Sequence, residues 1–252
     1  MKGLLFHKQL EIRVDVEGEE FRQGDTIPCT LTIKNRGATA VDVGVPVLAL
    51  AKGDLKKVKQ KAPDAFSMLA RADAAVPGSV APDQQCTTST RFQLEQNCHV
   101  TNKQSSLCIL YGVEGDDAAQ AHLQLPVLPH ADIESIVGVV ETSFQFVLKS
   151  WKSKSGWVSA KLKAPDEQRM TTIDELDLGF RFVDELLELD YTFKVKKLEA
   201  GPSTLEIQKK KQTFRQSLRR DEYLAPGGYV DSGLLEPKIE EILAQVSSKF
   251  AR

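Results

Sequence analysis

The chain has no long apolar run and only four cysteines, and both features limit the classes of protein to which it can belong. The N-terminal apolar run, residues 4–6, is too short for a signal-peptide core, and no later segment approaches a membrane span in length. We therefore expect a cytoplasmic protein. None of the cysteines forms a CxxC pair, which favours reduced thiols over disulfides or a zinc site. They are Cys29, Cys86, Cys98 and Cys108.

The sequence motifs of common catalytic sites are also missing. There is no GxGxxG or GxxxxGK[ST] phosphate loop, no GxSxG nucleophile elbow and no HExxH zinc helix. Asp174, Glu175 and Asp177 could supply paired carboxylates for acid–base chemistry, but they flank a predicted strand and are more simply its solvated residues. We therefore expect a non-enzymatic protein that needs no cofactor.

One short cluster has the residue types of a metal site. His130, Asp132 and Glu134 are spaced two apart and would share one face of an extended segment, where they could bind a divalent metal. The alternative is a linker that runs into a helix cap, and a helix would destroy that geometry. We favour the cap, and so expect no metal.

Length and charge set the broad class. A chain of 252 residues, 41% hydrophobic and 27% charged, has room for one large or two medium globular domains. The formal net charge of −2 is spread evenly over the two halves. Neither half is a general surface for nucleic acids, so no nucleic-acid partner is expected, and a membrane surface is a weak possibility.

Apolar and polar residues alternate through residues 10–37. Two runs with a period of two, residues 10–17 and 27–34, each give an extended segment one apolar face. Gly24-Asp25 can form the turn between them, and Asn35-Arg36-Gly37 is expected to close the second strand in the same way. This hairpin predicts the opening of a β-sandwich.

The rest of the first half predicts more short strands. A third strand over residues 41–50 would continue a meander, with Pro46 at an edge or a bulge. Phe66, Leu69 and Ala70 have helical spacing behind Asp64, a possible cap. Further strands are predicted over residues 87–94, 107–113 and 119–127, which together fill an immunoglobulin-sized sandwich.

A boundary is predicted between Pro126 and Pro129. Beyond it, Asp132 can cap a short helix, and the last element is an amphipathic helix that starts at Pro237. The strands expected between these helices cover residues 144–148, 157–163, 176–182, 187–196 and 205–214. The predicted domains are two tandem β-sandwiches, residues 1–129 and 130–234, followed by a C-terminal helix, residues 235–252.

These segments, taken in order, resemble the arrestin fold, and more narrowly the bacterial sporulation-control proteins that share it. The C-terminal helix is not part of the similar pattern. The resemblance implies an all-β, arrestin-like adaptor or regulator that binds other proteins through loops, strand edges and the cleft between domains. The similar segments are residues 21–25, 107–127 and 173–180, the helix from Asp132, Phe144-Gln145-Phe146 with Lys149-Ser150, and Leu189-Asp190.

Two basic clusters could hold an acidic or phosphorylated protein partner, or an anionic headgroup. Such lysines also commonly solvate strand edges and discourage aggregation. In the second cluster we expect Leu205 and Ile207 on the buried face, with Lys209 and Lys211 continuing that line out to a rim. The first cluster centres on Lys56, Lys57 and Lys59, within a run from Lys52 to Lys61; the second is Lys209, Lys210, Lys211, Arg215, Arg219 and Arg220.

Two apolar features are also candidate contact sites. The terminal helix carries one apolar stripe, which could dock on its own domain, the favoured interpretation, or occupy a groove of a partner. Trp151 and Trp157 bracket a predicted hairpin and would mark a contact site if exposed, or core if buried. The stripe is Ile239, Ile242, Leu243 and Val246.

Two classes of function follow from the sequence. The first is an arrestin-like interaction protein, and a bare strand edge or an apolar groove would favour it. The second is a β-sandwich module with a small-molecule, carbohydrate or metal site that serves binding or hydrolysis. Exposed aromatic residues beside a concave sheet would favour this class.

Overall fold

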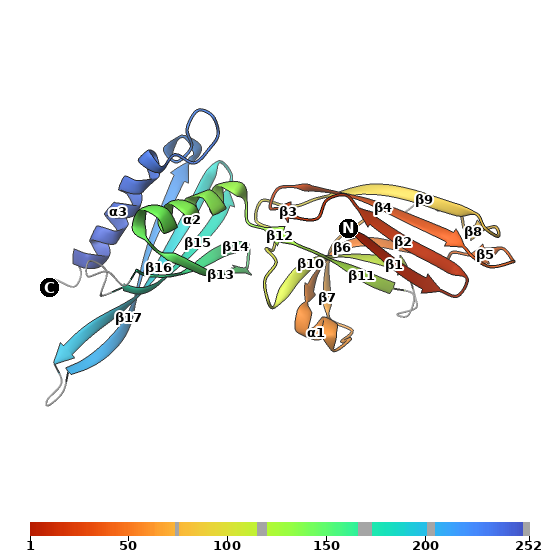
Figure 1. Ribbon diagram of the computed structural model, residues 1–252, viewed down its shortest axis with the longest axis horizontal. Helices are drawn as coiled ribbons and strands as arrows, with labels where there is room; N and C mark the ends of the chain where they lie inside the picture. Colours follow the sequence, from red (N-terminus) through yellow and green to blue (C-terminus); the bar gives the residue numbers. More distant parts are fainter. Residues whose placement is uncertain (74–75, 115–119, 166–172, 201–204, 249–252) are drawn as a thin grey trace. The chain divides into compact units, whose positions relative to one another are not determined.

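The structure is a computed structural model that describes residues 1–73, 76–114, 120–165, 173–200 and 205–248. The chain is all-β with a C-terminal helix, as the sequence predicts, and it divides into two compact units, Met1–Leu128 and Pro129–Arg252. Figure 1 shows the elements of each unit.

Two four-stranded antiparallel sheets build the N-terminal unit. Their inward side chains form one core, which includes Ile12, Leu31, Leu48 and Ile109. The first sheet has the order β1 (Lys2–His7), β2 (Leu10–Val16), β4 (Thr26–Asn35), β9 (Gln85–Gln93). The second has the order β11 (Gln120–Leu125), β10 (Ser105–Val113), β6 (Pro46–Asp54), β7 (Phe66–Arg71). Two short pairs join β3 (Phe21–Arg22) to β12 (Val127–Leu128) and β5 (Val41–Asp42) to β8 (Ser79–Val80).

The predicted opening hairpin is confirmed, but one of its two turns works differently. Strands β2 and β4 pair antiparallel, and Gly24 between them has a φ of 91°, which favours glycine. Gly37 does not have a positive φ, so the expectation for it is wrong. A Cβ at Gly37 would overlap the end of the flexible Gln9 side chain, which would have to move to admit it.

Three other expectations for this half are wrong. Strand β6 pairs with β10 and β7 instead of continuing a meander from β4, and Pro46 is only the first residue of this central strand. The residues expected to form a helix behind Asp64 form β7, because pairing with β6 outweighs their helical spacing. The helix lies earlier, as α1 (Leu55–Lys59), where the side chain of Asp54 accepts hydrogen bonds from the backbone N–H groups of Lys56 and Lys57.

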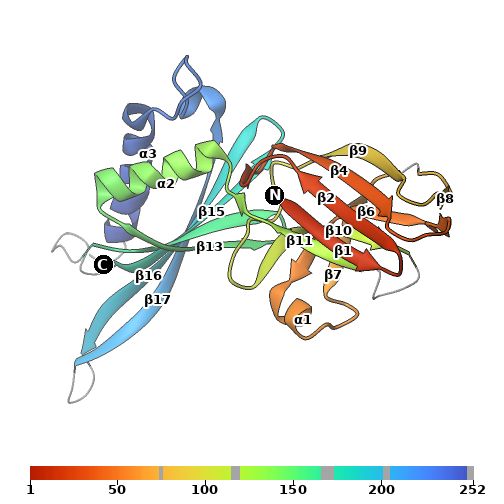
Figure 2. The same ribbon diagram turned by 45° about the vertical axis from the view of Figure 1, so that its right-hand side comes forward.

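A single five-stranded antiparallel sheet builds the described part of the C-terminal unit. The layer that faces it consists of two helices, α2 (Ala131–Phe144) and α3 (Ser232–Ser248), rather than a second sheet, and both lie on one face (Figures 1 and 2). The sheet has the order β13 (Val147–Lys154), β14 (Trp157–Lys163), β15 (Ile173–Val183), β16 (Leu186–Ala200), β17 (Leu205–Arg219), and a 3-10 turn, η3 (Arg220–Glu222), follows it.

Most of the predicted strands of this half are confirmed, but the ends of two elements differ from the prediction. Phe144 is the last residue of α2, and the next strand begins only at Val147. Helix α3 begins at Ser232, and Pro237 lies inside it. The helix starts early because Oδ1 of Asp231 accepts a hydrogen bond from the N–H of Gly233, which caps its first turn.

Candidate functional site: the charged face of the C-terminal sheet

The C-terminal sheet has one apolar face and one charged face. Alternation along β16 directs Leu187, Leu189 and Tyr191 into the core beneath the helices, so the residues between them point to the opposite side. On that side, cations outnumber carboxylates. We call it the charged face, and it carries Lys161, Lys163, Asp174, Glu175, Asp177, Arg181, Glu188, Asp190, Lys194, Lys196, Lys209, Lys211, Arg215 and Arg219.

Four lysines of β16 and β17 oppose one another on this face. Lys194 lies directly across from Lys211, and Lys196 directly across from Lys209. Like charges in opposite positions of neighbouring strands are destabilising unless counter-charges lie nearby. We call these four residues the lysine quartet.

Two carboxylates of β15 neutralise part of the quartet. Oδ1 of Asp174 lies 2.8 Å from Nζ of Lys196, and its Oδ2 lies 3.9 Å from Nζ of Lys209. Oε1 of Glu175 lies 2.8 Å from Nζ of Lys194. In the part of the chain that the structure describes, no carboxylate pairs with Lys211. Within 4 Å, two carboxylates thus serve the four ammonium groups, and the quartet keeps an excess of positive charge.

The pKa values of the paired groups move in the directions expected for these contacts. The hydrogen bond from Lys196 lowers the pKa of Asp174, and the hydrogen bond to Glu175 raises the pKa of Lys194. Both pairs therefore stay ionised at neutral pH, and the face keeps its pattern of charge.

At the end of the charged face away from the lysine quartet, an arginine packs over a tryptophan ring. The guanidinium of Arg181 lies 4.6 Å from the ring centre of Trp157 and donates two hydrogen bonds to Oε2 of Glu188. Trp151 packs against the core below the helices. Both tryptophans are half-buried, so neither is the exposed aromatic site that the sequence left open.

The second basic cluster is only partly brought together. Lys209, Lys211, Arg215 and Arg219 share the charged face, whereas Lys210 points to the opposite side of β17 and Arg220 lies in η3. Strands β16 and β17 pair without a register shift, and the inward line of β17 is Gln212, Phe214, Gln216 and Leu218. The side chains of Leu205 and Ile207 lie outside the described residues.

Sequence reasoning missed the lysines that other strands contribute to this face. Lys161, Lys194 and Lys196 alternate with buried residues of β14 and β16, and the same period of two that predicts those strands also places these lysines on one side. The pairing order of the strands, which brings them beside β17, has no such local signal.

The first basic cluster lies on the other unit. Lys56, Lys57 and Lys59 belong to the five-residue helix α1, where Lys57 forms an ion pair with Asp64. Side-chain and coulombic contacts with that carboxylate raise the pKa of Lys57. None of the residues of this short helix is buried, so its lysines face solvent.

The apolar stripe of α3 belongs to the core of its own unit. Ile239, Ile242 and Val246 are buried against the sheet and α2, and Leu243 packs against the same cluster. In this structure the stripe is thus not exposed for a partner, and the helix docks internally.

The residues considered for a metal site form a helix start. His130 is the N-cap of α2, and its Nδ1 accepts a hydrogen bond from the N–H of Asp132, so the cap is His130 and not Asp132 as expected. Oδ2 of Asp132 accepts a hydrogen bond from the hydroxyl of Tyr223. Among the residues described, no three histidine, cysteine or acidic side chains gather as metal ligands.

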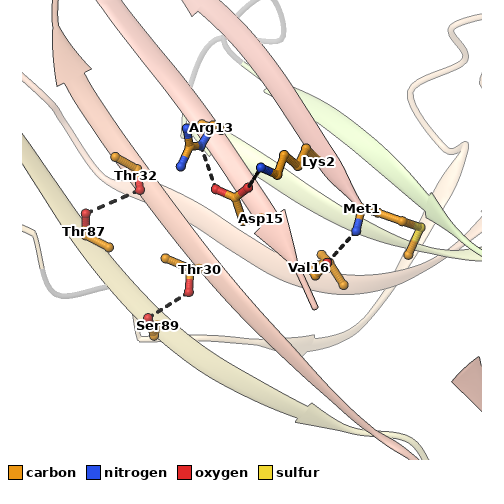
Figure 3. A network of polar contacts seen from close by, with 9 residues as sticks. All are labelled: Met1, Lys2, Arg13, Asp15, Val16, Thr30, Thr32, Thr87 and Ser89. Atoms are coloured by element: carbon orange, nitrogen blue, oxygen red, sulfur yellow. Dashed lines mark hydrogen bonds and ion pairs between the residues drawn. The ribbon is translucent and has the colours of Figure 1, made fainter. Parts of the chain in front are cut away.

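The N-terminal unit carries a second polar surface, on the outer face of its first sheet (Figure 3). The hydroxyls of Thr30 and Ser89 lie 2.9 Å apart between β4 and β9, and Oδ2 of Asp15 accepts a hydrogen bond from Arg13 at 2.6 Å. A shallow hollow of about 450 Å³ opens beside them, lined by Glu17, Pro28, Cys29, Thr30, Ser89, Thr90 and Arg91. Exposed aromatic side chains are the feature expected of a carbohydrate site, and this lining contains none.

All four cysteines are free thiols, as the sequence predicts. Burial raises the pKa of Cys29 to about 12 and that of Cys108 to about 11. Neither thiol therefore ionises at neutral pH, which makes both unsuited to nucleophilic chemistry.

Comparisons with known proteins identify the fold. No protein family model matches the chain, and no curated protein matches it. The chain has the arrestin-like fold of the sporulation-control proteins, as its sequence resemblance predicts. One similar solved structure is Spo0M, a sporulation control protein from Bacillus subtilis, with a TM-score of 0.64 and 17% identity over 95% of this chain and 99% of that chain. At this identity the likeness is one of fold.

A second solved structure matches only in part. It is the alkylpurine DNA glycosylase AlkC from Pseudomonas fluorescens bound to DNA that contains an abasic site analog. The match covers 47% of this chain and 30% of that chain, with 14% identity and a TM-score of 0.27. A score this low does not establish a shared fold.

In the described part of this chain, no helix is long and apolar enough to cross a membrane.

Proposed function

We propose that this protein is a non-enzymatic, arrestin-like regulatory adaptor that binds acidic surfaces of other proteins in the cytoplasm through its charged face. The observation that carries the proposal is the lysine quartet, in which four ammonium groups gather around two carboxylates. Such an excess of charge on one face attracts an acidic partner at long range and fixes its orientation.

The fold supports a regulatory role over a catalytic one. A solved structure with the same fold is described as a sporulation control protein. In this chain, the acidic residues that could have served acid–base chemistry, Asp174 and Glu175, are ion-paired to lysines. Paired in this way, they shape a binding surface and are poorly placed to exchange protons at neutral pH.

Exposure favours β17 as the part of the face that meets the partner. The side chains of Lys209 and Arg215 are 70% and 80% exposed, whereas that of Lys161, nearer the middle of the sheet, is 32% exposed. Each of the two exposed cations lies more than 3.5 Å from its nearest carboxylate. They can therefore pair with a partner without breaking a short ion pair first.

Capture from the native cytoplasm tests this proposal. Wild-type protein is compared with the Lys209→Ser/Lys211→Ser variant, and a matched Lys56→Ser/Lys57→Ser/Lys59→Ser variant serves as control. We expect proteins that wild type retains at low salt to be lost with the β17 variant and kept with the α1 variant. Screening acts over about 8 Å at physiological ionic strength, so added salt should weaken the same interactions.

Two results would contradict the proposal. One is an identical set of captured proteins for wild type and the β17 variant, with both shown to be folded by circular dichroism. The other is loss of capture with the α1 variant alone, which would move the binding surface to the N-terminal unit.

A further inference from the structure

Strand β17 is a long edge with few of the usual protections against pairing. Among the described strands it pairs only with β16, and its 15 residues run without a register shift and without proline. The opposite edge, β13, has 8 residues and a shift between Leu148 and Ser150. Of the protections that natural proteins build into an edge strand itself, which are short length, bulges, proline and charged side chains, β17 has only charge.

The outward line of β17 repeats a cation or a hydroxyl at every second residue. Pleated strands share one period, so a strand added beside β17 would place alternate side chains about 5 Å from this line. The intervening residues of the added strand would lie beside Phe214 and Leu218, which belong to the apolar side. The outward line is Lys209, Lys211, Thr213, Arg215, Ser217 and Arg219.

The cations on the outward line of β17 have only long contacts to carboxylates of their own sheet. The close carboxylate contacts go to β16, at 2.8 Å for both Lys194 and Lys196. The edge cations have longer contacts, 3.9 Å for Lys209 and 3.8 Å for Arg215. Acidic side chains on a neighbouring strand would supply the counter-charges that the edge lacks.

We propose that β17 accepts a sixth strand from a partner protein, an extended acidic segment in which Asp or Glu recurs at every second residue. This inference rests on the proposed function and adds the form of the partner. Backbone hydrogen bonds along the free edge would give affinity, and the alternating charges would select the register.

Peptide binding to the full-length protein tests the inference. Three fluorescent peptides of about ten residues, a strand's usual upper length, are compared by fluorescence anisotropy. The first alternates Glu with Thr and Val, the second has the same composition with its Glu residues in one block, and the third is the alternating peptide with N-methylated backbone amides. We expect the alternating peptide to bind at least about tenfold more tightly than either of the others.

Two variants and a second measurement make the test specific to this edge. Lys209→Ser/Lys211→Ser should weaken binding of the alternating peptide, whereas Lys210→Ser, on the other side of the strand, should leave it nearly unchanged. Hydrogen exchange should show new protection of β17 amides when the alternating peptide is bound.

Each failure has a distinct meaning. Equal affinity for the alternating and block peptides, both lost in the double variant, would overturn strand addition and leave binding of acidic surfaces intact. Absence of binding by all three peptides would also overturn strand addition, while the capture experiment would still decide the proposed function. Protection confined to strands other than β17 would overturn the assignment of the edge.

Discussion

Glu175 accepts a hydrogen bond from Lys194 across two neighbouring strands, with Nζ and Oε1 2.8 Å apart. Its other oxygen, Oε2, lies 3.0 Å from Nζ of Lys161 on the strand to the other side. One carboxylate therefore connects β14, β15 and β16 on the charged face. It links the stability of the C-terminal unit to the charges that we assign to binding.

This bridge predicts a measurable dependence of stability on pH. Partial burial acts to raise the pKa of Glu175, but hydrogen bonds from Lys194 and Lys161 outweigh it, and the pKa falls below its usual 4.5. A lowered pKa in the folded state contributes stability that is present above pH 4.5 and is lost as the pH falls through the folded-state value. Glu175→Gln should therefore reduce the free energy of unfolding by about 1 kcal/mol at neutral pH and by less in acid.

Urea denaturation followed by tryptophan fluorescence measures this effect, because both tryptophans, Trp151 and Trp157, lie in the C-terminal unit. Glu185→Gln is a matched control, since Glu185 is exposed in the turn between β15 and β16. If Glu175→Gln and Glu185→Gln had the same effect at both pH values, the bridge would contribute nothing to stability.

A pair of glycine substitutions tests the opening turn. Gly24 has a φ of 91°, so Gly24→Val should lower the free energy of unfolding of the N-terminal unit by about 1–2 kcal/mol. Gly78→Val is the control, because Gly78 lacks a positive φ and a Cβ there would meet nothing within 4 Å. Differential scanning calorimetry should show a lower melting temperature only for Gly24→Val, and equal melting temperatures would contradict the turn geometry.

Local patterns in the sequence predict much of this fold. The alternation of Leu10, Ile12 and Val14 predicts β2, and glycine at position 24 predicts its turn toward β4. The same reasoning finds β14, β15 and β16 with boundaries close to those observed. Each of these elements is set by a period of two and by turn residues, both of which can be read within a few positions.

Long-range pairing is what the sequence does not reveal. Strand β6 joins the second sheet through β10, more than fifty residues later, and no local feature near Pro46 indicates this. Phe66 and Leu69 have helical spacing, yet they lie in a strand because β6 offers a pairing edge. The lysine quartet is hidden for the same reason, since it depends on how β16 and β17 are paired.

Separating the units tests the predicted boundary. A fragment of residues 1–129 should fold alone and unfold cooperatively, because it keeps the core of both sheets and the pairing of β12 with β3. The N–H of Phe21 donates to the carbonyl of Pro126, so the end of the fragment is tied to its beginning. Circular dichroism and thermal denaturation of the purified fragment measure this.

A shorter fragment provides the control. Residues 1–119 lack β11 and β12 and with them Leu125 and Val127, both fully buried. Removing fully buried side chains opens the core, and we expect this fragment to aggregate or remain unfolded. If residues 1–129 behaved in the same way, the two units would depend on each other for folding.

The role of the α3 stripe can be decided by comparing stability with binding. Ile239 is 2% exposed within the core of the C-terminal unit, so Ile239→Ala should lower its free energy of unfolding by about 2–5 kcal/mol. Glu240→Ala, on the exposed side of the same helix, should have almost no effect. Urea denaturation followed by tryptophan fluorescence compares the two variants. A stripe that instead served a partner would leave stability unchanged in Ile239→Ala while abolishing capture of cytoplasmic proteins, and that pair of results would move the binding site from the charged face to α3.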